Sequence, residues 1–228
     1  MEAAQKDELM NRVIAHRAWS ETLGSFWRGN VAQCITECVR LHDVRAFEID
    51  VRETRDAHFI ISHDRRLEGC EICSTDVHAF ESGVNFLEDV LRCTDRLSAA
   101  SHDATGLRLL LNVEIKHVTH THKLYEMLAE YKHIDIVVTS FHARFLYGGD
   151  ALCKRGLVLH GLLPCVVPAF VDVLVVDYEM WKHRARQCRA LAPHAQLWLY
   201  TAQTPDELRA CLADRQCSRV VCDQSVFS

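Results

Sequence analysis

Residues 107–141 read LRLLLNVEIKHVTHTHKLYEMLAEYKHIDIVVTSF, and two kinds of pattern alternate within them. The two ends, Leu107–Lys116 and Ile134–Phe141, are nearly continuous apolar runs, as in strands buried on both faces of a parallel sheet. Between them, apolar residues recur at helical spacing: Leu124, Met127, Leu128 and Tyr131. This stretch therefore predicts a strand, a helix and a second strand parallel to the first.

The same alternation continues in both directions along the 228 residues. Six further segments have the composition of strands: Arg12–His16, Arg45–Val51, Gly156–Leu163, Val171–Asp177, Gln196–Tyr200 and Arg219–Asp223. Helical patterns lie between them, and the clearest begins at Thr204, where a proline at the first helical position and a capping glutamate follow. Eight strands that alternate with helices predict an α/β fold, a single (β/α)8 TIM barrel formed by residues 1–228 as one domain.

One strand-like segment, Phe59–Ser62, interrupts this alternation. It follows Val51 too closely for a parallel crossover, which needs a dozen residues or more. We therefore expect a β-hairpin extension after the second strand, turning through residues 54–57. The end of this extension, His63-Asp64, would return toward the end of the second barrel strand.

Composition excludes several classes of protein. The net charge is −5 and no run of Lys and Arg occurs, so we expect no nucleic-acid partner. No segment approaches 18 uninterrupted apolar residues, and residues 1–8 contain no stretch typical of a signal peptide. We therefore expect neither a transmembrane segment nor a secretory signal.

The 11 cysteines are odd in number and scattered along the chain. Disulfide-stapled folds are usually shorter and carry denser cysteine frameworks. We therefore expect mostly free thiols, a reducing compartment and a cytoplasmic location. Cys70 and Cys73 could form a redox or zinc pair, but no second pair at zinc spacing follows, and loop thiols are the simpler interpretation.

Polar residues gather at the carboxyl ends of the expected strands. The first strand ends in His16-Arg17, the second carries Glu48 and Asp50, and the third carries Glu114 and Lys116, while His63 ends the hairpin. In an α/β barrel the carboxyl ends of the strands form the face on which active sites are built. Residues two apart in a strand share a face, so each pair points the same way.

Three carboxylates that converge in a barrel mouth repel one another unless a cation lies among them. Glu48, Asp50 and Glu114 therefore predict a site for one hard divalent metal ion, Mg2+ or Ca2+. His16 and His63 could supply a proton acceptor and a proton donor, while Arg17 and Lys116 could hold an anion. The set suits cleavage of a small-molecule phosphodiester, and the chain has no Gly-x-Ser-x-Gly elbow for acyl transfer.

At these residues the chain resembles the glycerophosphodiester phosphodiesterase family. The resemblance rests on five blocks in order: His16-Arg17, Glu48-Ile49-Asp50-Val51, Thr54-Arg55-Asp56, Ile61-Ser62-His63-Asp64 and Glu114-Ile115-Lys116. Weaker matches follow in later strands and end at Val221-Cys222-Asp223. Ala18 and Ala57 stand where the family usually has glycine.

The resemblance implies a barrel and a metal-dependent phosphodiesterase that hydrolyses glycerophosphodiesters to glycerol phosphate and an alcohol. It implies that His16 and His63 are the acid/base pair, that Glu48, Asp50 and Glu114 bind the metal, and that Arg17 and Lys116 contact phosphate. Two other functions stay open. One is a phospholipase D-like lyase that acts on lysophospholipid or sphingomyelin and releases a cyclic phosphate. The other is a non-catalytic binding protein that has kept the barrel.

Overall fold

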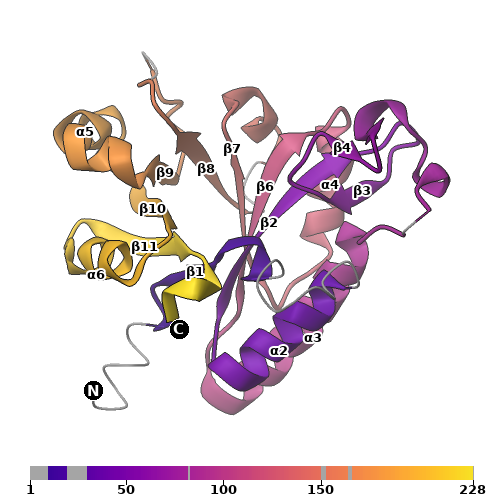
Figure 1. Cartoon of the computed structure of the whole chain (residues 1–228), viewed down its shortest axis with the longest axis horizontal. Helices are drawn as coiled ribbons and strands as arrows, with labels where there is room; N and C mark the ends of the chain where they lie inside the picture. Colours follow the sequence, from indigo (N-terminus) through magenta and orange to yellow (C-terminus); the bar gives the residue numbers. More distant parts are fainter. Residues whose placement is uncertain (1–9, 20–29, 82, 150–152, 164–165, 228) are drawn as a thin grey trace.

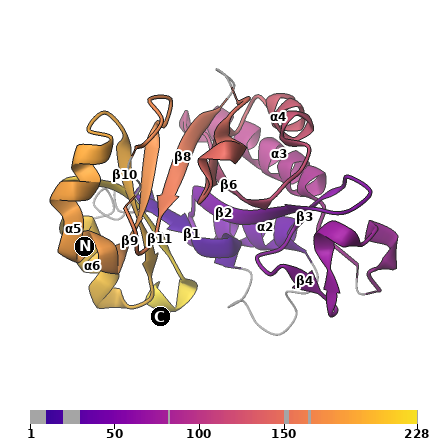
Figure 2. The same ribbon diagram turned by 90° about the horizontal axis from the view of Figure 1, so that it is seen from above.

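The computed structural model describes residues 10–19, 30–81, 83–149, 153–163 and 166–227. Eight parallel strands form its sheet: β1 (Val13–Ala15), β2 (Ala46–Glu53), β6 (Leu110–His117), β7 (Asp135–Ser140), β8 (Lys154–Leu159), β9 (Val173–Asp177), β10 (Gln196–Ala202) and β11 (Cys217–Cys222). The sheet closes because β1 pairs with β11 on one side and, through Ala15 and Phe47, with β2 on the other. The expected (β/α)8 barrel is therefore confirmed (Figures 1 and 2).

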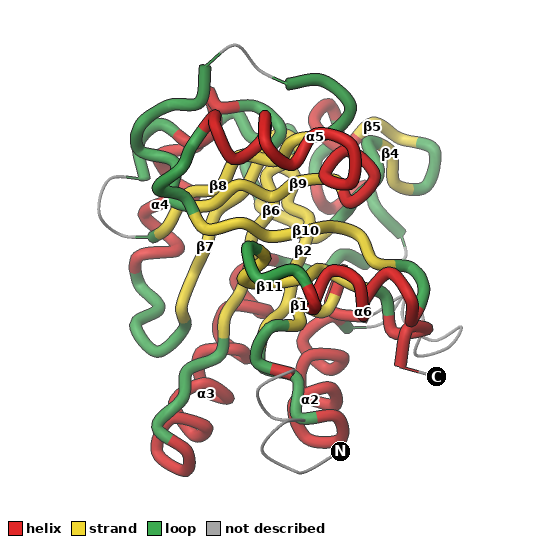
Figure 3. The backbone as a smooth tube through the Cα atoms, turned by 90° about the vertical axis from the view of Figure 1, so that its left-hand side faces the viewer, coloured by secondary structure: helices red, strands yellow, loops and turns green. Residues whose placement is uncertain are grey.

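The expected hairpin extension is also present. β3 (Phe59–Ile61) runs antiparallel to β2, with Val51 opposite Ile61. The short strands β4 (Arg66–Leu67) and β5 (Cys70–Glu71) then form a small ribbon apart from the barrel, which the sequence pattern did not predict (Figure 3). Two single turns of 3-10 helix, Ile72–Ser74 and Val77–Ala79, complete the excursion before the chain enters its next helix.

Five helices occupy the outside of the described structure: α2 (Val31–His42), α3 (Leu87–Thr105), α4 (Thr121–Ala129), α5 (Tyr178–Leu191) and α6 (Pro205–Ala213). α2 and α3 lie side by side, away from α5 and α6 (Figure 1). The capping box predicted at Thr204 is formed. The Thr204 side chain accepts a hydrogen bond from the Glu207 amide, and the Glu207 side chain accepts one from the Thr204 amide. Among the described residues the ring of helices is incomplete: the β7–β8 connection shows only a 3-10 turn, η4 (Ala143–Leu146), and the β8–β9 connection shows no helix.

A compact apolar cluster fills the barrel interior, and every one of the eight strands contributes to it. Its buried members are Ile14, Ala46, Leu110, Val137, Val158, Val173, Val175, Trp198 and Val221. A second, larger cluster packs the outer faces of the strands against the helices. The strands therefore bury both faces, which explains the continuous apolar runs in the sequence.

The strand expected over residues 156–163 differs from the observed one. β8 begins two residues earlier and ends at Leu159, because Gly161 adopts a left-handed conformation and the Leu162 amide turns back to the His160 carbonyl. Leu162 is 83% exposed, so its apolar side chain belongs to the rim of the barrel and not to a strand. An apolar run thus concealed the end of the strand.

Length and hydropathy distinguish the described helices from membrane-spanning helices. None of the described helices combines the length and the apolar character needed to span a bilayer.

Candidate active site

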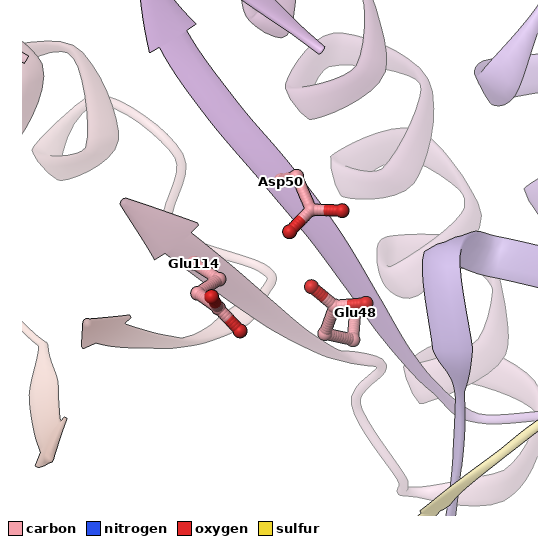
Figure 4. Close-up of side chains that lie close together, drawn as sticks. All are labelled: Glu48, Asp50 and Glu114. Atoms are coloured by element: carbon pink, nitrogen blue, oxygen red, sulfur yellow. The ribbon is translucent and has the colours of Figure 1, made fainter. Parts of the chain in front are cut away.

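Glu48, Asp50 and Glu114 meet in the barrel mouth. Each follows an interior residue of its own strand at even spacing: Glu48 and Asp50 follow Ala46 on β2, and Glu114 follows Leu110 on β6. Because side chains of a strand alternate between faces, all three point inward above the apolar interior (Figure 4). Asp50 and Glu114 are register partners, and one ligand oxygen of each carboxylate lies within 4.8 Å of the others.

The environment of this cluster disfavours three negative charges. Burial raises the pKa of Glu48 well above its ordinary value, and the neighbouring carboxylates of Asp50 and Glu114 raise it further. Burial also raises the pKa of Glu114, although the ammonium of Lys116 works against that rise. The three carboxylates therefore need cationic neighbours to remain ionised together.

Two basic residues supply part of that charge. The Lys116 ammonium lies 3.1 Å from Asp50 Oδ1 and also contacts Glu114. Burial alone would lower the pKa of Lys116, but the carboxylates of Asp50 and Glu114 outweigh it and raise that pKa. Arg17 contributes through its backbone amide, which donates to Glu48 Oε2 at 2.9 Å, and through Nε, 3.5 Å from Asp50 Oδ2.

The chain bends sharply where it leaves β1. Arg17, Ala18 and Trp19 all have positive φ, between 48° and 54°, a left-handed conformation that is unfavourable for residues with a Cβ. The buried Trp19 indole donates to the Cys222 carbonyl at 2.8 Å and helps hold this bend. The bend directs the Arg17 amide onto Glu48, and it explains why glycine would suit position 18.

His16 lies at the start of this bend and is oriented by an acidic partner. Its Nδ1 lies 2.7 Å from Asp223 Oδ1, just beyond the end of β11. A carboxylate on one ring nitrogen fixes the tautomer and leaves Nε2 for chemistry. The sequence interpretation placed Asp223 at a strand end but gave it no role. The rule that exposed the other site residues, a polar residue at the carboxyl end of a barrel strand, also identifies Asp223.

His63 lies in the segment between β3 and β4 and is held against β2 by contacts to its main chain. The Ser62 amide donates to the Asp50 carbonyl at 2.9 Å, and Arg52 Nη2 donates to the His63 carbonyl at 2.8 Å. The imidazole Nδ1 lies 2.9 Å from Asp64 Oδ1, but both side chains are substantially exposed. His63 is thus held near β2 through its backbone, while its ring faces solvent.

The carboxylate cluster has the donor set of a hard-cation site. It offers carboxylate oxygens from two adjacent strands, and Glu48 and Asp50 are each 3% exposed. Within the described residues, Glu48 Oε1 is buried and accepts no hydrogen bond. Buried polar atoms are rarely left unpartnered, so this oxygen fits a role as a ligand to Mg2+ or Ca2+.

Fold and site together define a class: a closed parallel (β/α)8 barrel with an acidic cluster and flanking histidines at its carboxyl mouth. No protein-family model and no curated protein sequence matches the chain.

Solved structures do match the fold. A glycerophosphodiester phosphodiesterase from Thermotoga maritima aligns with a TM-score of 0.69 and 18% identity over 95% of this chain and 96% of its own. An enzyme of the same name from Parabacteroides distasonis has a TM-score of 0.69 and 18% identity over 93% and 92%. A phosphodiesterase from Oleispira antarctica, solved with the product sn-glycerol-3-phosphate, has a TM-score of 0.69 and 16% identity over 95% and 94%. At these identities the likeness establishes the fold, and it is the fold that the sequence resemblance implied.

Proposed function

We propose that this protein is a metal-dependent phosphodiesterase that hydrolyses glycerophosphodiesters to glycerol phosphate and an alcohol. The observation that carries the proposal is the buried carboxylate cluster at the carboxyl mouth, with the unpartnered Oε1 of Glu48. The barrels of similar fold include one solved with sn-glycerol-3-phosphate bound, which supports a product of this kind here.

In this proposal Glu48, Asp50 and Glu114 hold one divalent cation. A cation bound there would supply charge neutralisation for a phosphoryl oxygen. Lys116 and Arg17, which lie against the carboxylates, are placed to hold the remaining phosphoryl oxygens.

The two histidines would move the protons of hydrolysis. One imidazole accepts a proton from water as the water oxygen bonds to phosphorus, and the other donates a proton to the alcohol oxygen as its bond to phosphorus breaks. The Asp223 carboxylate keeps His16 Nδ1 engaged, so its Nε2 is the atom available for transfer. Asp64 does the same for His63 in a more exposed setting.

A hydrolysis assay tests the proposal. Purified protein with added Mg2+ or Ca2+ should hydrolyse glycerophosphocholine and the generic ester bis(4-nitrophenyl) phosphate, and a chelator should stop both reactions. Absence of turnover on both substrates at every metal tested would instead favour a non-catalytic binding protein.

A second candidate function, the phospholipase D-like lyase, has one observation in its favour. A cavity of about 550 Å³ opens beside the mouth between the ends of β7 and β8, and its lining is largely apolar. Leu162 and Val166 on its rim are 83% and 77% exposed. Phe141 lines the same cavity, and the centre of its ring lies 5.2 Å from Lys116 Nζ, so the cavity adjoins the proposed site. An acyl chain would fit an apolar lining of this kind.

Phosphorus NMR of the products separates the two reactions. A lyase transfers the phosphoryl group to a substrate hydroxyl and yields a cyclic phosphate, while hydrolysis yields a phosphate monoester. We expect the monoester from glycerophosphodiesters. A cyclic product from lysophospholipid, formed at a higher rate, would establish the second function.

A further inference from the structure

A second, smaller cavity adjoins the site and shares no lining residue with the apolar one. It has a volume of about 270 Å³ and lies between the ends of β2 and β6 and the β4–β5 ribbon. Its lining is Arg52, Glu53, Arg65, Glu71, Cys73, Lys116 and His117. Lys116 lines the cavity and also contacts the carboxylate cluster, so the cavity adjoins the proposed site. The volume is several times the ~30 Å³ that a water molecule occupies.

The two acidic side chains of this cavity already have partners. Glu71 accepts from Arg65 Nε at 2.7 Å and from the Cys73 thiol. Glu53 is 2% exposed and accepts from the backbone amides of residues 119 and 120 and from the imidazole of His120. Neither carboxylate is therefore available to balance another cation.

Arg52 is a basic residue of this cavity whose carboxylate neighbours, Asp50 and Asp64, act on it only as nearby charges. Its Nε and Nη2 both donate to the His63 carbonyl, at 3.2 and 2.8 Å, and no carboxylate of the described residues lies within ion-pair distance of its guanidinium. The partial burial of this group makes an absent counter-ion more costly than it would be at the open surface.

His117 adds a second unsatisfied group beside Arg52. A β-bulge shifts the register after Val51, so that Arg52 stands opposite His117 on the neighbouring strand. Both residues line the same cavity, so the bulge brings their side chains to one space. His117 Nδ1 is buried and, among the described residues, has no hydrogen-bond partner. The guanidinium N–H groups that the His63 carbonyl does not use, together with the imidazole nitrogen, could bind an acceptor.

We infer that the Arg52–His117 cavity is a substrate subsite for an anionic group, a carboxylate or a phosphate, carried by the alcohol part of the phosphodiester. The inference rests on the proposed function. Lys116 and Arg17 are assigned to the phosphoryl oxygens, and the glycerol part of the substrate is uncharged, so an anion that pairs with Arg52 would come from the alcohol. The enzyme would accordingly prefer anionic leaving alcohols to neutral or cationic ones.

Two isosteric esters test this preference. The glycerol 3-phosphate diesters of 4-hydroxybenzoate and of 4-hydroxybenzamide differ by a carboxylate against a carboxamide. A charge-assisted hydrogen-bonded pair contributes about 1.5–3 kcal/mol, so the carboxylate ester should have a kcat/KM at least about tenfold higher. Arg52→Gln should bring the ratio close to one, and Arg52→Lys should keep part of the preference because it keeps the charge. The Tm of each variant verifies folding.

Arg215→Gln is the matched control, because it removes the same charge from an exposed position between α6 and β11. It should leave the ratio unchanged. A third diester, in which a phosphate monoester replaces the carboxylate on the same phenol, tests the other anionic group. We expect its kcat/KM to depend on Arg52 in the same way.

Calorimetric titration of both diesters into the protein keeps this test separate from that of the proposed function. If neither ester turns over, the proposed function fails, and the Kd values still decide the subsite. Equal kcat/KM and equal Kd for the two esters in the parent protein would overturn the inference. So would a preference for the carboxylate that Arg52→Gln leaves intact.

Discussion

At the scale of single residues, each histidine of the candidate site pairs with an aspartate, but the two pairs differ in their exposure to solvent. His16 and Asp223 are largely shielded, while His63 and Asp64 are open to solvent. Exposed ion pairs contribute little and are screened by salt, so Asp64 should matter less for its histidine than Asp223 does. We therefore expect Asp223 to act as a positioning residue for His16, the more enclosed of the two histidines.

Removal of either imidazole should slow turnover sharply. We expect His16→Ala and His63→Ala each to lower kcat by about 100-fold or more, the usual contribution of a positioned acid or base. His78→Ala, at an exposed position of the excursion, is the control and should have no effect. Steady-state assays of the purified variants provide the measurement, and near-normal turnover in either site variant would remove that histidine from the mechanism.

Ala57 illustrates a residue that the local backbone does not favour. Its φ is 63°, in the turn where its amide donates to the Thr54 carbonyl. Left-handed backbone costs a non-glycine residue about 1–2 kcal/mol. Glycine relieves that cost, but it loses about 0.4–1 kcal/mol by making the unfolded chain more flexible.

Ala57→Gly should therefore raise the free energy of unfolding by roughly 0.5–1 kcal/mol. Ala100→Gly, at an exposed position within α3, should lower it by about 1 kcal/mol. Urea unfolding of both variants measures the difference. A destabilised Ala57→Gly protein would show that the turn at residue 57 stores no strain.

At the scale of strands and helices, the pairs two residues apart on β2 and β6 determine the site. Strand period predicted from sequence that Glu48 and Asp50 share a face, as do Glu114 and Lys116, because alternation is a local property. The same reasoning could not predict that Lys116 would lie on Asp50, since that contact depends on the register between two strands far apart in sequence. Nor could it predict the bulge that sets Arg52 opposite His117.

Element boundaries were predictable where local chemistry marks them. The capping residues at Thr204 predicted the start of α6, and the helical spacing of Leu124, Met127 and Leu128 predicted α4. The end of β8 was not predictable, because exposed apolar residues such as Leu162 continue the pattern of a buried strand. The β4–β5 ribbon was missed for a related reason: its two strands have two residues each, too few for a periodic signal.

The carboxylate cluster predicts a pH dependence of stability for the metal-free protein. The folded-state pKa of Glu48 lies above its ordinary value of 4.5, so its contribution to stability is fully present below that pH and is lost as pH rises through the folded-state pKa. Glu48→Gln removes this titration. With chelator present, the Tm of the variant minus that of the parent should increase as pH rises from about 5 to about 8. A Tm difference that is constant over this range would contradict the assigned environment of Glu48.

At the scale of the whole molecule, many of the cysteines pack in the hydrophobic core. All ten cysteines within the described residues are free, and six of them are buried. Burial raises the pKa of Cys38 and of Cys211 to about 12. Protonated thiols of this kind are weak nucleophiles and pack as small apolar groups.

We therefore predict that a reducing agent neither lowers the Tm nor abolishes activity. Differential scanning calorimetry with and without reductant checks the first part, and the diester assay checks the second. A large fall in Tm on reduction would indicate structural disulfides and would argue against the reducing compartment expected from the sequence.

The proposed function depends on one divalent cation, which the three carboxylates of the barrel mouth would bind together. A ligand that binds only the folded state stabilises it by about 2.7 kcal/mol at a hundredfold excess over its Kd. Thermal unfolding of chelator-treated protein, titrated with Mg2+ and with Ca2+, measures this directly. We predict that the parent and the exposed-site control Glu81→Gln gain Tm with added metal, whereas Glu48→Gln, Asp50→Asn and Glu114→Gln fold but gain none. A parent protein whose Tm ignores both metals, or cluster variants that respond as the parent does, would contradict the account.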